Sequence, residues 1–326
     1  MTNRYTSFEA TAAAYTADTH TFTANRHDVD VVTEELTPER GNIYAVTSKG
    51  RTPRRRLKGP LKWSGNIETL LYTKSVPSLF YYALGANSTV NDVPTVGSNT
   101  HTVTPSTTIP DFILETGRDF DAFKYTGCVV TGWNVDFTPD AALSANFDIN
   151  ARKEQATASL GSVTFPDFDE AERTYSGVEV VSKVGAAEGG SPTSVSIVES
   201  ANISYENNFE DTAFTLSSQY LSGLFVNQIN ITGSLEISVL DWNAYDDVVA
   251  DTEKEWWFET SNGLTLTARR GYTFKLPRVS YDSSPLTTTN AERYVQSIDF
   301  TAASDSNSNA IEIDFVNAQT NAEFIA

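Results

Sequence analysis

The sequence contains few residues that could form a covalent or metal cross-link. Of its 326 residues, one is a cysteine, Cys128, and three are histidines. A single cysteine excludes an intrachain disulfide and a zinc site built from several cysteines. His20, His27 and His101 match neither HExxH nor another recognised metal-ligand spacing. A disulfide-stapled secreted scaffold is therefore excluded, and we expect no metal and no cofactor.

Catalytic motifs are missing as well. The sequence has no GxSxG, GxGxxG or GxxxxGKS/T segment, so nucleophile-elbow, dinucleotide-binding and P-loop chemistry lack support. Carboxylate pairs such as Asp167 with Asp169, or Asp246 with Asp247, are expected by chance in a chain with 42 acidic residues. They give poor support to a glycosidase pair or a calcium site. The sequence predicts a protein that is not an enzyme and has no catalytic residues.

Long hydrophobic runs are also lacking. No stretch approaches the roughly 18 consecutive apolar residues that a membrane helix needs. The first 27 residues are rich in Thr and Ala, without a basic start followed by an apolar stretch. We therefore expect no signal peptide and no membrane partner.

Basic residues are scarce. Lys and Arg total 23 against 42 Asp and Glu, which gives a formal charge of −19, and only nine of the 23 are lysine. Such a surface repels nucleic-acid phosphates and anionic lipid, which argues against tight DNA binding by the whole surface. Acidity with little lysine suits a salt-rich, halophilic cytoplasm, where self-repulsion is screened. An acidic protein of a mesophile fits the composition equally.

Enough apolar residues are present to build a core. Hydrophobic residues make up 40% of the chain and aromatic residues 11%, with a mean hydropathy of −0.30. This composition and length are typical of a soluble globular protein with one large β domain or two ordinary ones.

Two stretches of the chain resemble each other in order. Residues 61–68 (LKWSGNIE) align with residues 229–236 (INITGSLE), and each segment alternates apolar and polar residues as a half-buried strand does. Residues 123–124 and 147–151 align with residues 274–275 and 298–302, and residues 31–36 correspond loosely to residues 203–208. A polar loop from Asn87 to Pro110 absorbs the change in spacing as an insertion.

A helix follows each of the aligned strands. The first is expected from a Ser75 cap to Gly85, with Pro77 in its first turn. The second is expected to begin at an Asn243 cap and to carry an apolar stripe as far as Trp256. The Gly-rich stretch before Ser191 is a natural linker. We therefore expect two domains, residues 1–190 and 191–326.

The strands alternate between an apolar face and a polar one. Residues 125–151 predict a long antiparallel hairpin with one polar side. The polar positions hold short neutral residues and carboxylates, with Lys62 as the single cation. Such a face has little to offer a ligand that requires stacking or charge pairing. The acidic members singled out are Glu68, Asp136, Asp148, Glu236 and Asp299.

Several of these segments, taken in order, resemble one family. They are Gly65-Asn66-Ile67-Glu68 after an Arg-rich loop, a helix ending Ala83-Leu84-Gly85, residues 101–105 (HTVTP) leading to 109–112 (IPDF), and residues 123–130 (FKYTGCVV) followed by the hairpin. The order is similar to that of tail tube proteins of tailed bacterial or archaeal viruses, and the acidity would suit a haloarchaeal virus. The resemblance covers roughly residues 29–316.

The resemblance implies a mainly β fold, with two tandem tail-tube-like β-sandwich or barrel domains that each carry a flanking α-helix. In the family, six such domains form a ring, and stacked rings enclose a negatively charged channel for genome passage. The chain would then be a structural virion protein of the tail, made in the host cytoplasm. Its partners would be further copies of itself, other tail proteins at the tube ends, and viral DNA in transit. Three chains would close a ring if both domains are complete, and six if they are not.

In this context the five carboxylates are candidates for the channel lining, and a solvated outer face is the alternative. The basic residues cluster in one loop. It is interpreted as a clamp between subunits, because complementary charge fixes the register of self-association; a nucleic-acid contact and a solvated loop are the alternatives. Its candidate residues are Arg51, Arg54, Arg55, Arg56 and Lys58.

Two other functions compete with the tube. A carbohydrate- or surface-binding β-sandwich module of a salt-adapted microbe would use an aromatic platform, for which Trp256, Trp257 and Phe258 are the candidates. Core or interface anchors are the favoured interpretation of the same residues, because they lie at the end of an apolar stripe. An acidic β-sandwich hydrolase is the third possibility.

Overall fold

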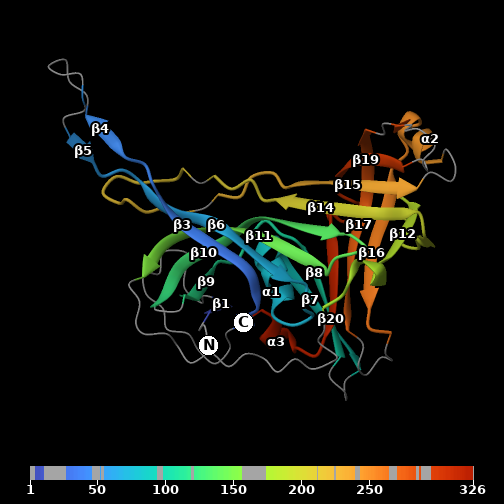
Figure 1. Cartoon of the computed structure of the whole chain (residues 1–326), viewed down its shortest axis with the longest axis horizontal. Helices are drawn as coiled ribbons and strands as arrows, with labels where there is room; N and C mark the ends of the chain where they lie inside the picture. The colour runs from blue at the N-terminus through green and yellow to red at the C-terminus, as the bar shows by residue number, and fades with distance from the viewer. Residues whose placement is uncertain are drawn as a thin grey trace.

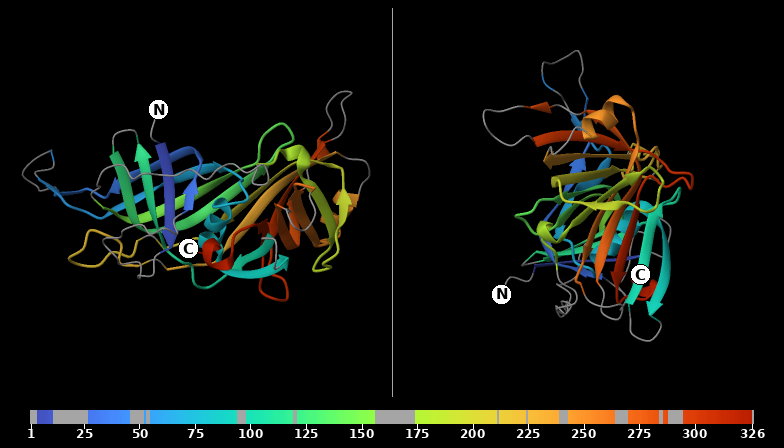
Figure 2. Two further views of the ribbon diagram at one scale, coloured as in Figure 1. Left: turned by 90° about the horizontal axis from the view of Figure 1, so that it is seen from below. Right: turned by 90° about the vertical axis from the view of Figure 1, so that its right-hand side faces the viewer.

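The computed structural model describes residues 4–10, 27–45, 52, 55–93, 98–118, 121–155, 174–210, 212–223, 225–238, 243–263, 270–283, 286–287 and 295–325. The fold is mainly β, and the strands pair antiparallel (Figures 1 and 2). Apart from the separate β4–β5 ribbon, the strands join in one hydrogen-bonded network. The predicted fold class, a mainly β chain, is confirmed.

The strands of the first half are β1 (Arg4–Ala10), β2 (His27–Val29), β3 (Val31–Arg40), β4 (Ile43–Ala45), β5 (Arg55–Leu57), β6 (Leu61–Leu70), β7 (Gly85–Val93), β8 (Ser98–Pro105), β9 (Phe112–Arg118), β10 (Asp121–Phe137) and β11 (Ser144–Gln155). Those of the second half are β12 (Val181–Ala186), β13 (Thr193–Val195), β14 (Val198–Glu206), β15 (Asn230–Ser238), β16 (Lys254–Ser261), β17 (Gly271–Ser283), β18 (Leu286–Thr287), β19 (Val295–Ala302) and β20 (Glu312–Asn317). The helices are α1 (Val76–Leu84), α2 (Asn243–Val249) and α3 (Asn321–Phe324), with one 3₁₀ turn at Gly177–Glu179.

Five strands recur in the same spatial order. The first repeat runs β9-β10-β11-β6-β3, and the second runs β16-β17-β19-β15-β14. The register recurs as well. Val130 faces Ile149 in the first repeat, and in the second Tyr281 faces Phe300, with each residue 151 positions further along the chain. The predicted alignments of residues 61–68 and 147–151 are confirmed, whereas the division into domains at residue 190 stays a prediction.

One alignment is wrong in register. The sequence alignment of the two repeats makes Val31 equivalent to Ile203, but in the structure the residue equivalent to Ile203 is Leu36. Leu36 faces Gly65 across β3 and β6, and Ile203 faces Gly233 across β14 and β15. β3 has a bulge between Val31 and Thr33, so Val31 and Leu36 both pack against the core although they lie five residues apart. The apolar pattern alone therefore does not separate the two registers.

The repeated glycine allows two strands to approach closely. A Cβ atom on Gly65 would lie 1.5 Å from the carbonyl oxygen of Glu35, and one on Gly233 would lie 2.2 Å from that of Asn202. No side chain fits at those separations. The same backbone contact therefore explains the glycine in both repeats.

Two pairings join the halves of the chain. The C-terminal part of β10 pairs with β14, and β8 pairs with β20. The expected polar loop from Asn87 to Pro110 is wrong, because most of it forms β7 and β8. Three polar side chains of β8, Ser98, Asn99 and His101, are buried, and the His101 ring contacts Asn317 Oδ1 at 3.0 Å. The insertion in the first repeat thus forms a hairpin on the edge of the second half.

The helices differ in how well their ends were predicted. α1 ends at Gly85, which adopts a left-handed conformation with φ 96° as expected, but Ser75 makes no side-chain cap bond. α2 ends at Val249, so the expected stripe as far as Trp256 is wrong. Trp256 instead lies in β16, opposite Leu276 of β17 and Val184 of β12. Pairing with two strands overrides the helical spacing of the local sequence.

α1 lies at the centre of a core drawn from both halves. The ring centroid of Phe80 is 5.0 Å from that of Trp133 and 4.9 Å from that of Phe147, and it is 5.7 Å from Phe274 and 5.4 Å from Phe315. All five side chains are buried. Rings from the two halves thus pack on one helix, and the polar side of the sheet points away from it.

Candidate functional site

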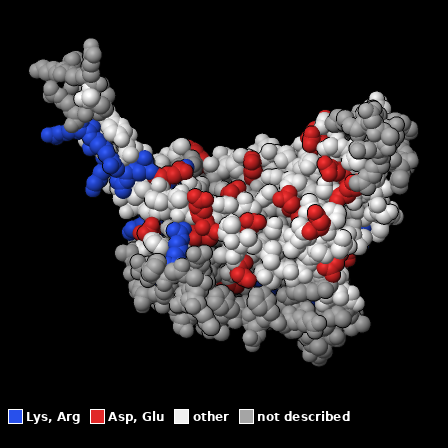
Figure 3. All heavy atoms as spheres, in the orientation of Figure 1, with Lys and Arg blue, Asp and Glu red and all other residues white. Residues whose placement is uncertain are grey.

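One polar face of the sheet crosses both repeats. A row of paired residues runs from β11 through β10, β14 and β15 to β19. The members of this row are Ser144, Asp136, Asn202, Ser234 and Asp299. Alternating positions on the same strands, such as Val135 and Ile298, are buried in the core. Carboxylates are spread over this side of the molecule (Figure 3).

The five predicted carboxylates lie on this polar face, henceforth the acidic face. Glu68 faces Asn146, Asp148 faces Asn66 and Gly132, and Glu236 faces Ser200 and Ser297. Asp136 and Asp299 belong to the row described above. The sequence alternation alone therefore placed these residues together, although they come from five different strands.

Neutral groups hold four of these carboxylates. Asn202 Nδ2 donates to Asp136 Oδ1 at 2.6 Å, Ser200 Oγ to Glu236 Oε2 at 3.0 Å, Ser283 Oγ to Asp299 Oδ2 at 2.7 Å, and Thr33 Oγ1 to Glu68 Oε2 at 3.3 Å. Within the described part of the chain, no Lys or Arg lies within ion-pair distance of any of the five. Among the described residues, no cation therefore neutralises their negative charge.

Asp148 is the carboxylate with a shifted pKa. It faces Gly132 on one side of that residue, and Glu206 faces Gly132 on the other. Because glycine has no side chain, no side chain at position 132 stands between the two acids. Asp148 Oδ2 lies 3.6 Å from where a Gly132 Cβ would be. Partial desolvation and then the charge of Glu206 raise the pKa of Asp148 above its ordinary value.

Two further acids on this face were missed from the sequence. Glu206 pairs with Gly132 and Asn230, and Asp282 Oδ2 accepts a hydrogen bond from Thr301 Oγ1 at 2.6 Å. The polar alternation of Asn202, Ser204 and Glu206 could have identified Glu206. Asp282 could not be found this way, because it lies in a β-bulge that interrupts the alternation.

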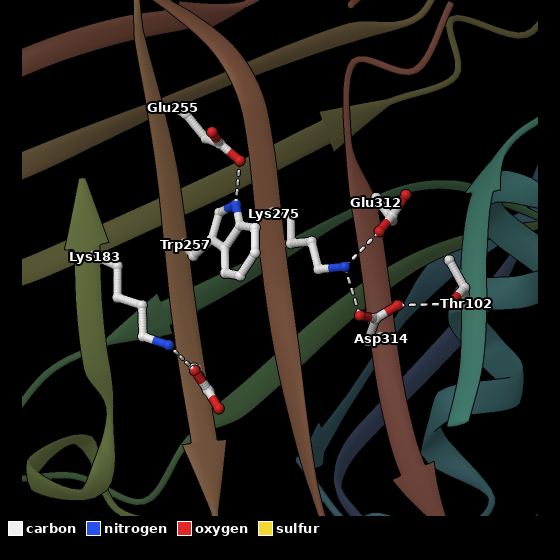
Figure 4. A network of polar contacts seen from close by, with 8 residues as sticks. Thr102, Lys183, Glu255, Trp257, Lys275, Glu312 and Asp314 are labelled. Carbon is white, nitrogen blue, oxygen red and sulfur yellow. Dashed lines mark hydrogen bonds and ion pairs between the residues drawn. The ribbon is translucent and has the colours of Figure 1, made fainter. Parts of the chain in front are cut away.

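A second polar cluster, on β16, β17 and β20, is neutralised (Figure 4). Lys275 Nζ lies 2.6 Å from Asp314 Oδ2 and also pairs with Glu312. Burial lowers the pKa of Lys275, but these two carboxylates more than offset it, and the net pKa is raised. Thr102 Oγ1 of β8 donates to Asp314 at 2.6 Å. This cluster fastens β8 to the second half, in contrast to the unneutralised acidic face.

The aromatic segment of β16 does not form a binding platform. Trp256 and Phe258 are buried in the core with 4% and 1% of their surface exposed. Trp257 points to the opposite side, between Lys183 Nζ at 5.7 Å and Lys275 Nζ at 5.2 Å from its ring centroid. Trp257 Nε1 donates to Glu255 Oε1 at 2.6 Å. The three rings thus serve as anchors of the fold, which agrees with the favoured interpretation of this segment.

The predicted basic loop forms an arm that projects from the sheet (Figures 1 and 3). Its two strands, β4 and β5, pair Ile43 with Leu57 and Ala45 with Arg55. Arg55, Arg56 and Lys58 are exposed, whereas Arg51 and Arg54 lie outside the described residues. Ile43, Tyr44 and Leu57 are 51%, 55% and 47% exposed. The arm therefore presents cations and apolar side chains together.

The second repeat has a matching extension, residues 207–229. Glu210 pairs with Phe225 there, as Ile43 pairs with Leu57 in the arm. This extension lies on the first repeat: Tyr220 stacks on Trp63 with ring centroids 6.2 Å apart, and Leu61 N donates to Gln219 O at 2.7 Å. The arm and the extension arise at the same place in the two repeats. The extension packs against the first repeat of its own chain, whereas the arm projects away from the sheet (Figure 1).

Among the described residues, no group of three or more His, Cys, Asp or Glu is arranged to hold a metal ion. None of the helices in the described ranges has the length and apolar character to cross a membrane. Cys128 is fully buried, and burial raises the pKa of its thiol.

Comparisons with known proteins assign a family to this arrangement. A solved structure titled "Cryo-EM structure of the anti-feeding prophage (AFP) baseplate, 6-fold symmetrised" aligns with 12% identity and a TM-score of 0.28, over 44% of this chain and 92% of that chain. Comparison with curated proteins gives no match. The family model described as "Phage tail tube protein" matches residues 6–318. Since this match spans nearly the whole chain, the protein belongs to the phage tail tube protein family.

Proposed function

We propose that this chain polymerises into stacked rings that form the tail tube of a virus and enclose the channel through which the genome passes. The observation that carries the proposal is the acidic face, which is continuous across both repeats. In the described part of the chain, no ion pair involves its five carboxylates. A single chain leaves the outer edges of such a sheet unpaired, and ring closure removes those edges.

The acidic face is proposed to line the channel, with Glu68, Asp136, Asp148, Glu236 and Asp299 pointing into it. A negative wall repels phosphates, so DNA passes without binding to it. Neutral hydroxyl and amide donors hold four of the carboxylates in place without cancelling their charge. This separates the acidic face from the Lys275 cluster, in which charges are paired.

The arm is proposed to clamp an acidic neighbouring subunit, with other tail proteins taking its place at the tube ends. Arg55, Arg56 and Lys58 are exposed on it, and Arg51 and Arg54 belong to the same segment. Apolar Ile43, Tyr44 and Leu57 at the same place favour contact with protein over contact with nucleic acid. Complementary charge would fix the register of the contact.

The recurring strand order supports two tube domains in each chain. Three chains would then provide the six positions of a ring, with three-fold symmetry and a pseudo-six-fold appearance. The β7–β8 hairpin and the basic arm would mark every second position. If the two halves instead form one unit, six chains make the ring.

Electron microscopy tests the proposed function. Concentrated protein in high salt is imaged in negative stain, and antibody against the chain is applied to purified virions. Stacked rings with a central channel, and antibody bound along the tail, are expected. A chain that remains monomeric at every concentration and is absent from tails would contradict the proposal.

A further inference from the structure

The contact between the two repeats within one chain has a defined geometry. Along one edge of β10, the last residue paired with β9 is Cys128. Beyond it, from Gly132 to Phe137, the strand pairs with β14, so that Val135 faces Ile203 and Asp136 faces Asn202. The first strand of the second repeat thus extends the sheet of the first repeat.

The second repeat has a matching edge. Along β17, the last residue paired with β16 is Val279, which lies 151 positions after Cys128. β18 follows β17 along the chain, and there Leu286 faces Gln296 and Thr287 faces Val295. These pairs repeat Val135 with Ala145 and Asp136 with Ser144 at the same spacing. In the described part of the chain, β18 pairs only with β19, so the edge that would match the β14-binding edge has no strand on it.

A complementary strand is exposed at the other end of the molecule. β3 occupies in the first repeat the place of β14 in the second, with Leu36 matching Ile203 and Glu35 matching Asn202. Among the described strands, β3 pairs only with β6. Figure 1 places β3 toward one end of the molecule and β19, the partner of β18, toward the other. A contact between these two edges joins copies head to tail, the arrangement that closes into a ring.

We propose that β3 of one copy pairs antiparallel with the β17–β18 edge of a second copy, with Leu36 opposite Leu286 and Glu35 opposite Thr287. The inference rests on the proposed assembly into rings and adds the surface and the register of the contact. The register is taken from the intrachain contact, in which Val135 faces Ile203. Leu286 is the residue of the second repeat equivalent to Val135, and Leu36 is the residue of the first repeat equivalent to Ile203. Pro38 matches Tyr205 and lacks an N–H group, so this pairing holds one backbone donor fewer, as edge strands tolerate.

The two helices support the same contact. Tyr205 and Asn207, at the end of β14, reach α1, and Asn207 Nδ2 donates to Ala83 O at 2.8 Å. Most of α1 is buried. α2 contacts β17, but Tyr245 and Val249 on it remain 41% and 69% exposed. A neighbouring β3 at the β17–β18 edge would cover α2 as β14 covers α1.

Paired cysteines test the register. Glu35→Cys with Thr287→Cys should form a disulfide between copies under mild oxidation, because directly opposite residues bring their Cβ atoms within bonding range. Asp136→Cys with Asn202→Cys is the intrachain control, since these side chains already meet at 2.6 Å. Thr33→Cys with Thr287→Cys is the off-register control. Cys128 is buried and gives no background.

The expected yield for Glu35→Cys with Thr287→Cys is at least about tenfold above the off-register pair, because the extra 7 Å or so of two residues exceeds disulfide reach. Mass spectrometry of mixed ¹⁴N- and ¹⁵N-labelled chains should find both labels in the linked peptides. Rings that assemble but form no disulfide between Glu35→Cys and Thr287→Cys on mild oxidation, while the intrachain control does oxidise, would overturn the register and leave the proposed function standing. Absence of both rings and cross-links, with the intrachain control oxidised, would overturn both.

Discussion

Trp133 and Tyr205 stack across the pairing of β10 with β14, with ring centroids 5.5 Å apart and 7° between the ring planes. Both are almost fully buried. Tyr205 also donates through its hydroxyl to Asn207 Oδ1 at 2.8 Å, and Asn207 in turn holds the end of α1. This contact fixes how the two repeats meet, and through it how the acidic face remains continuous.

Shortening the Tyr205 side chain should destabilise the folded chain. Tyr205→Phe removes one buried hydrogen bond and should lower the free energy of unfolding by about 1 kcal/mol. Tyr205→Ala also removes the stacked ring and should cost about 3 kcal/mol or more. Denaturant unfolding of the unassembled chain measures both. Tyr44→Ala, on the exposed arm, is the control and should change stability by less than about 0.5 kcal/mol. Equal effects at the two tyrosines would contradict this account of the contact.

The repeated glycines should tolerate no side chain. Gly65→Ala places a Cβ 1.5 Å from a carbonyl oxygen of the adjacent strand, which forces β3 and β6 apart. We expect a loss of more than about 2 kcal/mol in thermal or denaturant unfolding. Gly223→Ala is the matched control, because no atom lies within 4 Å of its added Cβ. A Gly65→Ala chain as stable as Gly223→Ala would show that the strands do not approach as described.

Asp148 should make stability depend on pH. Its pKa is raised in the folded chain, so the folded state binds the proton more tightly than the unfolded state does. Its contribution therefore favours folding at low pH and is lost as pH rises from the ordinary carboxyl value through the raised pKa. Asp148→Asn should be more stable than the parent chain at neutral pH, and this difference should vanish in acid.

NMR titration provides the direct check on the cause. Glu206→Gln removes the neighbouring charge and should move the pKa of Asp148 down toward its ordinary value, while desolvation keeps part of the shift. An unchanged pKa of Asp148 in Glu206→Gln would exclude the contact across Gly132 as a cause.

The arm should matter for assembly and not for folding. Replacement of Arg54, Arg55 and Arg56 by Ser should leave the unfolding transition unchanged, since Arg55 and Arg56 are exposed, but should shorten tubes or prevent them. The same three positions changed to Lys keep the charge and serve as the control. Micrographs and circular dichroism measure the two effects. Normal tube length in the Ser variant, or loss of the monomer fold, would rule out the clamp.

Salt should promote assembly. Each chain carries a formal charge of −19, and stacked copies concentrate that charge, so assembly should weaken as ionic strength falls. Light scattering across a salt series follows this. Assembly that improves in dilute buffer would argue against like-charge repulsion as the controlling term and against adaptation to high salt.

The sequence was most informative where residues alternate. The acidic face and the hairpin of β10 and β11 follow from period-two patterns, and the repeat follows from Gly65 and Gly233 in equivalent strands. β7 and β8 were missed because Thr, Ser and Asn dominate them, although Thr suits strands and the buried His101 ring contacts Thr89, Asn317 and Gln319. The closeness of Asp148 and Glu206 depends on the register of β10 with β11 and β14, which no local pattern encodes.

The most direct test of the central claim is a cryo-EM reconstruction of assembled tubes, resolved well enough to trace strands. We expect rings of three chains with pseudo-six-fold appearance and a channel lined by Glu68, Asp136, Asp148, Glu236 and Asp299. Six chains per ring would overturn the two-domain assignment alone. A channel lined by another face, with these carboxylates on the outside of the tube, would contradict the central claim.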